Sequence, residues 1–284
     1  MTVGPNENTD SRNRLAEKVA VVSGAGSIGE GWGNGKAAAF VYGKEGAKTF
    51  CVDYRLEAAE ETVKIITDAG GEAIAYSADV TQEEEVKNMV NSCVDRWGQI
   101  DILHNNVGGQ GTGRSLDTIT IDDWNATFER NVTTAMLTCR AIVPIMEKQG
   151  NGSIINISSI AGVRHLNVPT AVYSSTKGAM IEFTKNIAIQ HARSGIRANC
   201  ICPGYIDTPF IRRLVNGKPS YTYKGYTSAE EYTAARDTIV PSGRMGTAFD
   251  VAYASLFLAS DESTHVTGIH IVVDGGVTAT APGV

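Results

Sequence analysis

The chain has 284 residues, of which 42% are hydrophobic and 20% charged, as in a globular protein rather than a disordered one. Its net charge of −6 argues against a nucleic-acid partner, and five scattered cysteines without a C-x-x-C spacing predict no metal site. Residues 1–14 are polar and no apolar run reaches about eighteen residues, so we expect no secretory signal, no membrane partner and a cytoplasmic protein.

Short apolar runs alternate with longer stretches of helical periodicity, the pattern of a parallel sheet covered by helices. The runs are β-branched and almost continuously hydrophobic, as strands buried on both faces are. We therefore predict one α/β domain over residues 15–277, a Rossmann-like, doubly wound, seven-stranded parallel sheet with helices on both faces, between a flexible N-terminal tail (1–14) and a C-terminal tail (278–284). The predicted strands are Val19–Ser23, Thr49–Asp53, Ala73–Ala78, Ile100–Asn105, Ser153–Ser158, Arg197–Cys202 and Gly268–Val273. The predicted helices include Leu56–Ala69, Glu83–Trp97, Asp122–Glu147, Ala171–His191 and Asp250–Ala259.

The first predicted strand runs into a glycine-rich segment, residues 23–35, which an alanine-rich helix follows. Such a turn lets the backbone approach a pyrophosphate and aims the helix N-terminus at it. This position favours dinucleotide binding over a merely flexible loop. Three glycines are expected to act here, and which loop amides hold the phosphates stays open. The predicted contacts are Gly24, Ser27, Ile28, Gly31, Trp32 and Gly33.

Asp53 ends the second predicted strand, twenty residues after Gly33. A carboxylate at this point accepts hydrogen bonds from the adenosine ribose and repels a 2′-phosphate. Tyr54, also a predicted contact, follows it, whereas Arg55 could partly accommodate a phosphate. We expect NAD in preference to NADP.

Polar residues also close the third and fourth predicted strands, where a doubly wound sheet presents its ligand crevice. An acid and amides there could bind the adenine and the ribose, although Asn and Gly are also common turn formers. The predicted cofactor contacts are Asp79, Val80, Asn106 and Gly108.

Tyr173 and Lys177 lie four residues apart in the predicted helix Ala171–His191, and therefore on one face. A phenol titrates near pH ~10, and a lysine cation beside it favours the phenolate and lowers that pKa. The result is a general acid/base suited to an alcohol oxygen, which a serine of the pair Ser158-Ser159 could hold in place. By itself the spacing also fits two ordinary helix residues; with the cofactor features it predicts carbonyl/alcohol redox chemistry.

The segment Phe210–Pro241 interrupts the alternation, because it is polar, rich in tyrosine and without a predicted strand. In such a fold a long strandless segment is usually a lid over the substrate, here at about residues 210–241. Its tyrosines and residues 164–166 suggest a pocket for a cyclic or aromatic compound, with surface tyrosines in a lid as the alternative. The residues concerned are Tyr221, Tyr223, Tyr226, Tyr232, Arg164, His165 and Leu166.

From about Lys18 to Gly276 the chain resembles the short-chain dehydrogenase/reductase family, in its standard single-domain branch. The glycine loop is three residues longer than the family's usual one when Gly24 is paired with Gly31, and Val107 stands where alanine is common. The other motifs occur in the family's order. They are Asp79, Asn105-Asn106-Val107-Gly108, Asn131, Asn156-Ile157-Ser158-Ser159, Tyr173 with Lys177, and Pro203-Gly204-Tyr205-Ile206-Asp207-Thr208-Pro209.

The resemblance implies a catalytic tetrad of Asn131, Ser159, Tyr173 and Lys177. Tyr173 would exchange the proton with the substrate oxygen, which Ser159 would position. Lys177 would hold the nicotinamide ribose and lower the pKa of Tyr173, and Asn131 would support a water-mediated proton path. Ser159 is preferred to Ser158 because it holds the family's position and because alternation along a strand puts the two on opposite faces. Further implied cofactor contacts are Tyr173, Lys177, Pro203, Gly204, Ile206 and Thr208.

The leading hypothesis is an NAD-dependent oxidoreductase that interconverts a small-molecule secondary alcohol and a ketone. The resemblance also implies a homo-oligomer, a tetramer or dimer. The alternative is an NADPH-dependent reductase of 3-oxoacyl thioesters, whose basic patch Arg212, Arg213 and Lys218 could supply, but Asp53 argues against it. A dinucleotide sensor without chemistry is the remote alternative, although such proteins typically lose the tyrosine or the lysine.

Overall fold

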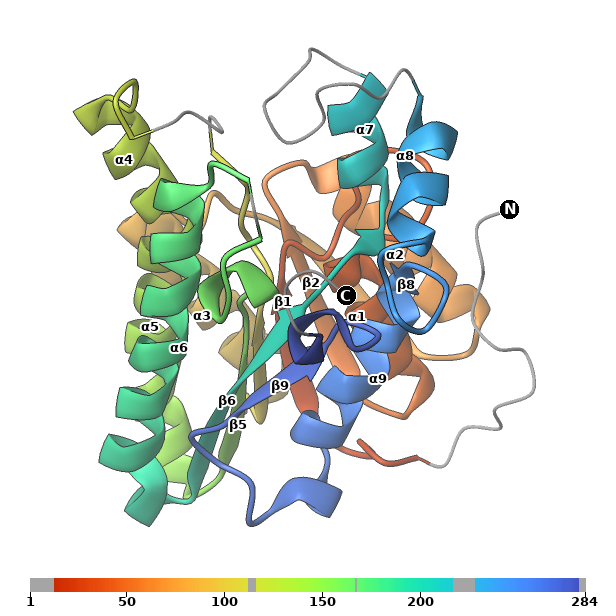
Figure 1. Cartoon of the computed structure of the whole chain (residues 1–284). Coiled ribbons are helices and arrows are strands. Elements are labelled where there is room, and N and C mark those ends of the chain that lie inside the picture. Colours follow the sequence, from red (N-terminus) through yellow and green to blue (C-terminus); the bar gives the residue numbers. More distant parts are fainter. Residues whose placement is uncertain (1–12, 112–115, 167, 217–227, 281–284) are drawn as a thin grey trace.

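The computed structural model describes residues 13–111, 116–166, 168–216 and 228–280. Seven parallel strands form one sheet in the order β3-β2-β1-β4-β5-β6-β9, which confirms the predicted doubly wound topology (Figure 1). The strands are β1 (Val19–Ser23), β2 (Lys48–Asp53), β3 (Glu72–Ser77), β4 (Ile102–Asn105), β5 (Gly152–Ile157), β6 (Ile196–Pro203) and β9 (His270–Val273). Each predicted strand is present, and most of the ends differ by one or two residues.

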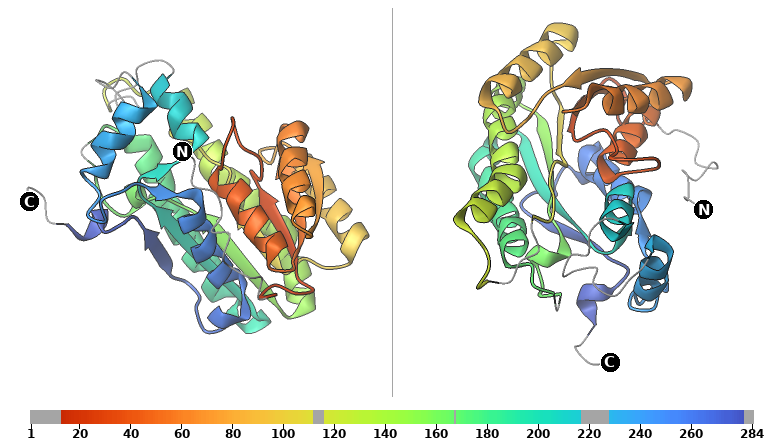
Figure 2. Two further views of the ribbon diagram at one scale, coloured as in Figure 1. Left: turned by 90° about the vertical axis from the view of Figure 1, so that its right-hand side faces the viewer. Right: turned by 90° about the horizontal axis from the view of Figure 1, so that it is seen from above.

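Helices cover both faces of the sheet (Figure 2). On one face α1 and α2 pack together and α1 packs on α9; on the other α3 packs on α5, and α6 lies against β6. An apolar core fills the space on each side, because the central strands are buried on both faces. These helices are α1 (Asn34–Lys44), α2 (Leu56–Asp68), α3 (Glu83–Trp97), α5 (Thr134–Gln149), α6 (Ala171–His191) and α9 (Ala248–Ala259).

The prediction of one continuous helix over residues 122–147 is wrong. α4 (Ile121–Phe128) and α5 are separated by a π-helical turn, Glu129–Thr133. The side chain of Asn131, inside this turn, binds both main-chain groups of Gly109, at 2.8 and 2.9 Å. A side chain drawn into a neighbouring loop accounts for the extra residue in the turn, and such bulges are frequent at functional sites.

The segment predicted to be a strandless lid contains two helices, α7 (Pro209–Asn216) and α8 (Ala229–Asp237), which pack against each other. Two short parallel strands that the sequence did not predict, β7 (Ile206–Asp207) and β8 (Gly246–Thr247), flank it. Figure 1 shows α7 and α8 above the carboxyl end of the sheet, across from α4. Tyr221, Tyr223 and Tyr226 lie outside the described residues.

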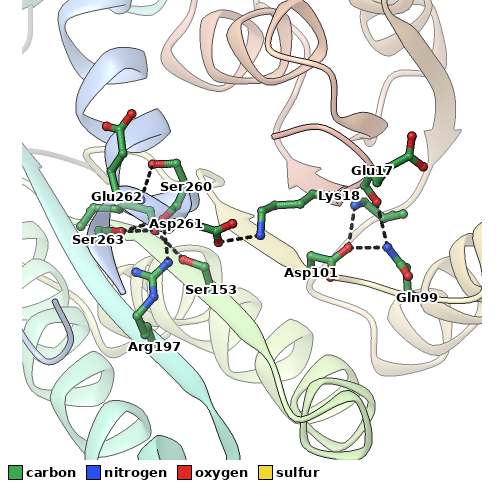
Figure 3. Close-up of polar contacts among 12 residues, drawn as sticks. Glu17, Lys18, Gln99, Asp101, Ser153, Arg197, Ser260, Asp261, Glu262 and Ser263 are labelled. Carbon is green, nitrogen blue, oxygen red and sulfur yellow. Dashed lines mark hydrogen bonds and ion pairs between the residues drawn. The ribbon is translucent and has the colours of Figure 1, made fainter. Parts of the chain in front are cut away.

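The opposite edge of the sheet, at the amino ends of the strands, is held by polar contacts (Figure 3). Asp101 accepts a hydrogen bond from the amide of Val19 at 2.8 Å, and Lys18 pairs with Asp261 at 2.8 Å. The hydroxyl of Ser153 donates to the carbonyl of Leu258 at 2.8 Å. These contacts tie β1, β5 and the end of α9 together, away from the carboxyl ends. In the part of the chain described, no helix has both the length and the apolar character needed to cross a bilayer.

Candidate active site

A cavity of about 860 Å³ lies at the carboxyl ends of the strands, between the glycine loop, α6 and the lid. Most of the residues that the sequence singled out line it, although they come from segments far apart in the chain. Those residues are Gly24, Ser27, Ile28, Gly33, Asp53, Tyr54, Asp79, Val80, Asn106, Gly108, Ser159, Tyr173, Lys177, Pro203, Gly204, Ile206 and Thr208.

Gly31, Trp32 and Asn131 do not line the cavity. The ring of Trp32 packs against Phe40 and Phe249, with centroids 5.3 and 4.8 Å apart, and so it belongs to the apolar core. The expectation that Trp32 contacts the phosphates is therefore not supported by its placement.

Two glycines that the sequence analysis did not single out have the closest contacts of this loop. A Cβ on Gly35, in the first turn of α1, would lie 2.0 Å from the carbonyl oxygen of Gly24. A Cβ on Gly26 would lie 2.7 Å from a carboxylate oxygen of Asp53. Glycine at such points permits close packing of helix and strand. The glycine that packs against Gly24 is thus Gly35 and not Gly31, which revises the expected pairing. When Gly33 and Gly35 take the places of the last two glycines of the family motif, the loop is five residues longer than in the family pattern.

Asp53 is buried at the end of β2, where its carboxylate accepts hydrogen bonds from the amides of Gly26 and Arg55, both at 3.1 Å. The guanidinium of Arg55 donates to the carbonyl of Ser27 at 2.6 Å and lies 3.9 Å from Asp53. One wall of the cavity therefore carries an acid that would repel a 2′-phosphate and a cation that would attract it.

Ser158 and Ser159 both follow β5, which ends at Ile157, so their separation does not come from strand alternation as expected. The Ser158 hydroxyl donates to the main-chain carbonyl of Lys177 at 2.7 Å. The Ser159 hydroxyl accepts from the amide of Ala161 at 3.1 Å and lies near enough to the Tyr173 side chain to lower the pKa of that phenol. Ser159 is thus the serine placed beside the phenol.

Tyr173 and Lys177 stand on the same side of α6, with the Lys177 Nζ 5.7 Å from the centroid of the Tyr173 ring. The Nζ donates to the carbonyl of Ile157 at 2.9 Å. Burial raises the pKa of Tyr173, and the hydrogen bond from Ser159 opposes that shift. Burial also lowers the pKa of Lys177 to about 8. Desolvation penalises the phenolate and dominates this shift, and the expected lowering of the Tyr173 pKa by Lys177 stays a prediction.

Asn131 is fully buried behind the cavity wall, and its amide also donates to the hydroxyl of Thr176 at 2.9 Å. Its carboxamide oxygen and the Lys177 Nζ approach the same point, since a Cβ on Gly108 would lie 3.1 and 3.2 Å from them. Asn131 thus fixes the loop that follows β4. Its place in a water-mediated proton path stays a prediction.

The lid side of the cavity is lined mainly by aromatic and apolar side chains, with one arginine among the described residues, Arg236. Leu166 and Tyr232 line it, but Arg164 instead donates to the carbonyls of Val277, Thr278 and Thr280. Further lining residues are Tyr205, Phe210, Ile211, Arg236 and Met245 on the lid side, and Gln110 and Arg130 from the segment after β4 and the π-helical turn. Of the expected basic patch, Arg212 is paired with Asp207, and Lys218 lies outside the described residues.

Comparison with known proteins places this site among oxidoreductases. Residues 29–278 match the family described as Enoyl-(Acyl carrier protein) reductase. The chain is 35% identical over 267 residues to 2,5-dichloro-2,5-cyclohexadiene-1,4-diol dehydrogenase of Sphingobium indicum, covering 93% of this chain and 97% of that protein. A solved structure of a candidate short-chain dehydrogenase/reductase from Burkholderia xenovorans has a TM-score of 0.89 at 38% identity, with 94% and 99% of the two chains covered. Gluconate 5-dehydrogenase from Burkholderia cenocepacia, in complex with NADP and tartrate, has a TM-score of 0.82 at 31% identity, covering 95% and 99%.

Proposed function

The chain belongs to the short-chain dehydrogenase/reductase family, and from that premise we propose that it is an NAD-dependent oxidoreductase that interconverts a secondary alcohol and a ketone. The observation that carries the proposal is the position of Ser159 beside Tyr173, on a cavity that Lys177 and the glycine loop also line. A phenol, a hydroxyl and an amine so arranged can hold an alcohol oxygen and exchange its proton.

The cavity fits a dinucleotide cofactor. At Gly24, Gly26 and Gly33 the backbone lines the cavity without a side chain, so a ligand can approach it closely. α1 begins beside these glycines with its N-terminus at the cavity, and a helix N-terminus favours a pyrophosphate. Asp53 would bind the adenosine ribose, and Lys177 with the turn 203–208 would hold the nicotinamide end. When bound, the cofactor supplies or accepts the hydride.

In the proposed mechanism Tyr173 gives a proton to the carbonyl oxygen during reduction and takes it from the alcohol during oxidation. Ser159 donates to that oxygen and fixes its position beside the phenol. Burial lowers the pKa of Lys177 to about 8, so the charged and neutral forms of the amine differ little in free energy near neutral pH. Lys177 can therefore pass a proton onward. Asn131 positions the loop beside Lys177 through its bonds to Gly109.

We propose NAD as the cofactor because Asp53 is buried at the cavity wall, where its charge acts with little solvent screening. Arg55 is held by the carbonyl of Ser27 and by Asp53 itself, which opposes its use for a 2′-phosphate. The related gluconate 5-dehydrogenase structure contains NADP, and the two cofactors therefore need a direct comparison.

We propose a cyclic or aromatic hydroxy compound as substrate, since Leu166, Tyr205, Phe210 and Tyr232 give the lid side an apolar and aromatic lining. A relative that acts on a cyclohexadiene diol is consistent with this. The alternative, an NADPH-dependent reductase of 3-oxoacyl thioesters, is less well supported, because Asp53 disfavours NADPH and Arg212 is paired with Asp207. A non-catalytic sensor is disfavoured by the presence of both Tyr173 and Lys177.

We also propose a domain organisation for the chain. Residues 15–277 would form the catalytic domain, with a substrate lid at about 210–241 and tails at 1–14 and 278–284. The bonds from Arg164 to the carbonyls of Thr278 and Thr280 support a C-terminal tail that begins docked on the domain. By likeness to its family, the protein would act as a homo-oligomer in the cytoplasm.

The proposal is tested by the absorbance of reduced nicotinamide, with a panel of cyclic, aromatic and linear secondary alcohols and NAD or NADP in parallel. We expect turnover with NAD on a ring-bearing alcohol. Tyr173→Phe should abolish that turnover while leaving NAD binding within about twofold, because the phenol oxygen alone is removed. Turnover with NADP only, or a Tyr173→Phe variant as active as the parent, would overturn the proposal.

A further inference from the structure

We propose that Arg164 strengthens substrate binding by fastening one wall of the cavity to the C-terminal segment, residues 274–280. The wall is the substrate loop, defined as residues 160–166 and 168–170. The inference rests on the proposed function, since it concerns the substrate end of the same cavity. Arg164 is a positioning residue, because it does not line the cavity itself and acts through loop residues that do.

The substrate loop joins two residues of the candidate active site. It begins directly after Ser159 and ends just before α6, whose third residue is Tyr173. Leu166 and Val168, from the second half of the loop, line the cavity. A movement of this loop therefore changes the space beside the two groups proposed to hold the substrate oxygen.

The side chain of Arg164 connects this loop to the other end of the chain. Its Nη1 donates hydrogen bonds to the main-chain carbonyls of Val277, Thr278 and Thr280, at 3.3, 2.9 and 2.6 Å. The first two of these residues belong to a short 3-10 helix, and the third follows it. The last carbonyls of a helix have no partner within it, so a cation at this end satisfies them and is favoured by the helix dipole.

The C-terminal segment is itself fixed to the end of the lid and to the turn that follows β6. The carbonyl of Gly275 accepts a hydrogen bond from the amide of Ser242, just beyond the lid, at 3.1 Å. A Cβ on Gly204 would lie 2.6 Å from the Cβ of Asp274, so the turn packs directly on the segment. The carboxylate of Asp274 also accepts from the amide of Thr278 at 2.6 Å. Arg164 thus fastens the substrate loop to a segment that is already held in place.

A loop held in its bound conformation binds a ligand more tightly than a free one, because binding no longer has to order it. Loss of the Arg164 bonds would therefore weaken substrate binding. The reacting groups would keep their own supports, since the Ser159 hydroxyl accepts from the amide of Ala161. The Ser158 hydroxyl likewise still bonds to the carbonyl of Lys177 in α6. We expect substrate affinity to fall while the chemical step persists.

The experiment measures oxidation of cyclohexanol by the full-length protein with NAD. The variants are Arg164→Met, Arg164→Lys and, as a control, Arg193→Met, which removes an exposed arginine just before β6 begins, at the opposite edge of the sheet. Arg164→Met should raise KM for cyclohexanol by about 10-fold, while kcat and Kd for NAD stay within about threefold. Arg164→Lys keeps a cation near the carbonyls and should restore part of the loss. Arg193→Met should leave all three quantities unchanged.

Hydrogen exchange, followed by mass spectrometry of peptides that cover the substrate loop, measures the fastening without any turnover. These amides should exchange about 10-fold faster in Arg164→Met than in the parent or in Arg193→Met. An unchanged KM would overturn the inference. Equal losses of kcat and of NAD affinity would also overturn it, since Arg164 would then only support the fold. If the parent oxidises no alcohol but loop exchange still depends on Arg164, the fastening stands and the oxidoreductase proposal falls.

Discussion

The hydroxyl of Ser158 donates a hydrogen bond to the main-chain carbonyl of Lys177 at 2.7 Å. This bond joins the residue that follows β5 to the second turn of α6. The Nζ of Lys177 in turn donates a hydrogen bond to the main-chain carbonyl of Ile157, at 2.9 Å. The two contacts set the distance between strand and helix, and the next serine, Ser159, then meets Tyr173. Ser158 thus supports the geometry of the site, and its neighbour Ser159 is the serine proposed to contact the substrate.

This division of roles predicts opposite effects for two adjacent substitutions. Ser158→Ala removes a buried hydrogen bond and should lower the free energy of unfolding by about 1–2 kcal/mol while most of the turnover remains. Ser159→Ala removes a donor to the substrate oxygen and should lower kcat by about 100-fold or more. Urea unfolding and steady-state kinetics on both variants measure the two effects. Equal kinetic losses would show that the serines are not separated in this way.

The packing of Gly35 against Gly24 predicts that the start of α1 tolerates no side chain there. Gly35→Ala would put a methyl group 2.0 Å from a carbonyl oxygen, so the helix must shift away from the loop. We expect NAD affinity to fall by at least about tenfold and stability by about 1–3 kcal/mol. The matched control is Gly29→Ala, whose nearest contact would be Pro209 at an ordinary 3.8 Å. Fluorescence titration with NAD and thermal unfolding test both; an unaffected Gly35→Ala would contradict the packing.

Neutralising Asp53 should change the choice of cofactor. Asp53→Asn keeps the size of the side chain and an acceptor for the Gly26 amide, but it removes the charge that repels a 2′-phosphate. The ratio of kcat/KM for NAD to that for NADP should fall by about 100-fold, through better use of NADP. Adding Arg55→Ala should reverse part of this gain, because the phosphate then loses its cation. An unchanged ratio in Asp53→Asn would show that another group sets the preference.

Burial of Lys177 predicts a particular dependence of stability on pH. Its pKa is about 8 in the folded protein and 10.5 for an exposed lysine, so between these values the unfolded chain holds a proton that the folded chain has released. Stability contributed by this group therefore rises with pH in that window, by about 1.4 kcal/mol per pH unit, and is constant below it. Urea unfolding from pH 7 to 10 should show the parent gaining on Lys177→Met above pH 8. Parallel profiles would mean that Lys177 titrates normally.

The sequence predicted helix bounds better than it predicted contacts between segments that are distant in the chain. α3 and α6 have the predicted bounds; α3 has an amphipathic period and ends before Gly98, whose left-handed backbone stops the helix. The glycine loop shows the opposite case. Counting from Gly24 suggested Gly31, but the residue that meets it is Gly35, and only the docking of α1 on the loop identifies it.

The break at residues 129–133 and the strands β7 and β8 were likewise missed for a physical reason. A π-helical turn forms when Asn131 binds Gly109 across the fold, and β7 pairs with β8 over some forty residues of chain. Neither interaction leaves a periodic trace in the sequence. Both shape the cavity, one behind Lys177 and the other at the base of the lid.

The parallel sheet, the order of the motifs and the chemical types of the groups at the carboxyl ends of the strands could be read from the amino-acid sequence, because periodicity and chain order are local properties. Which groups meet could not be read there. Folding supplied the separate contacts of Ser158 and Ser159, the pKa directions of Tyr173 and Lys177, and the packing of Arg236 against the rings of Tyr205 and Tyr232. These depend on desolvation and on contacts between distant segments, and both arise only when the chain has packed.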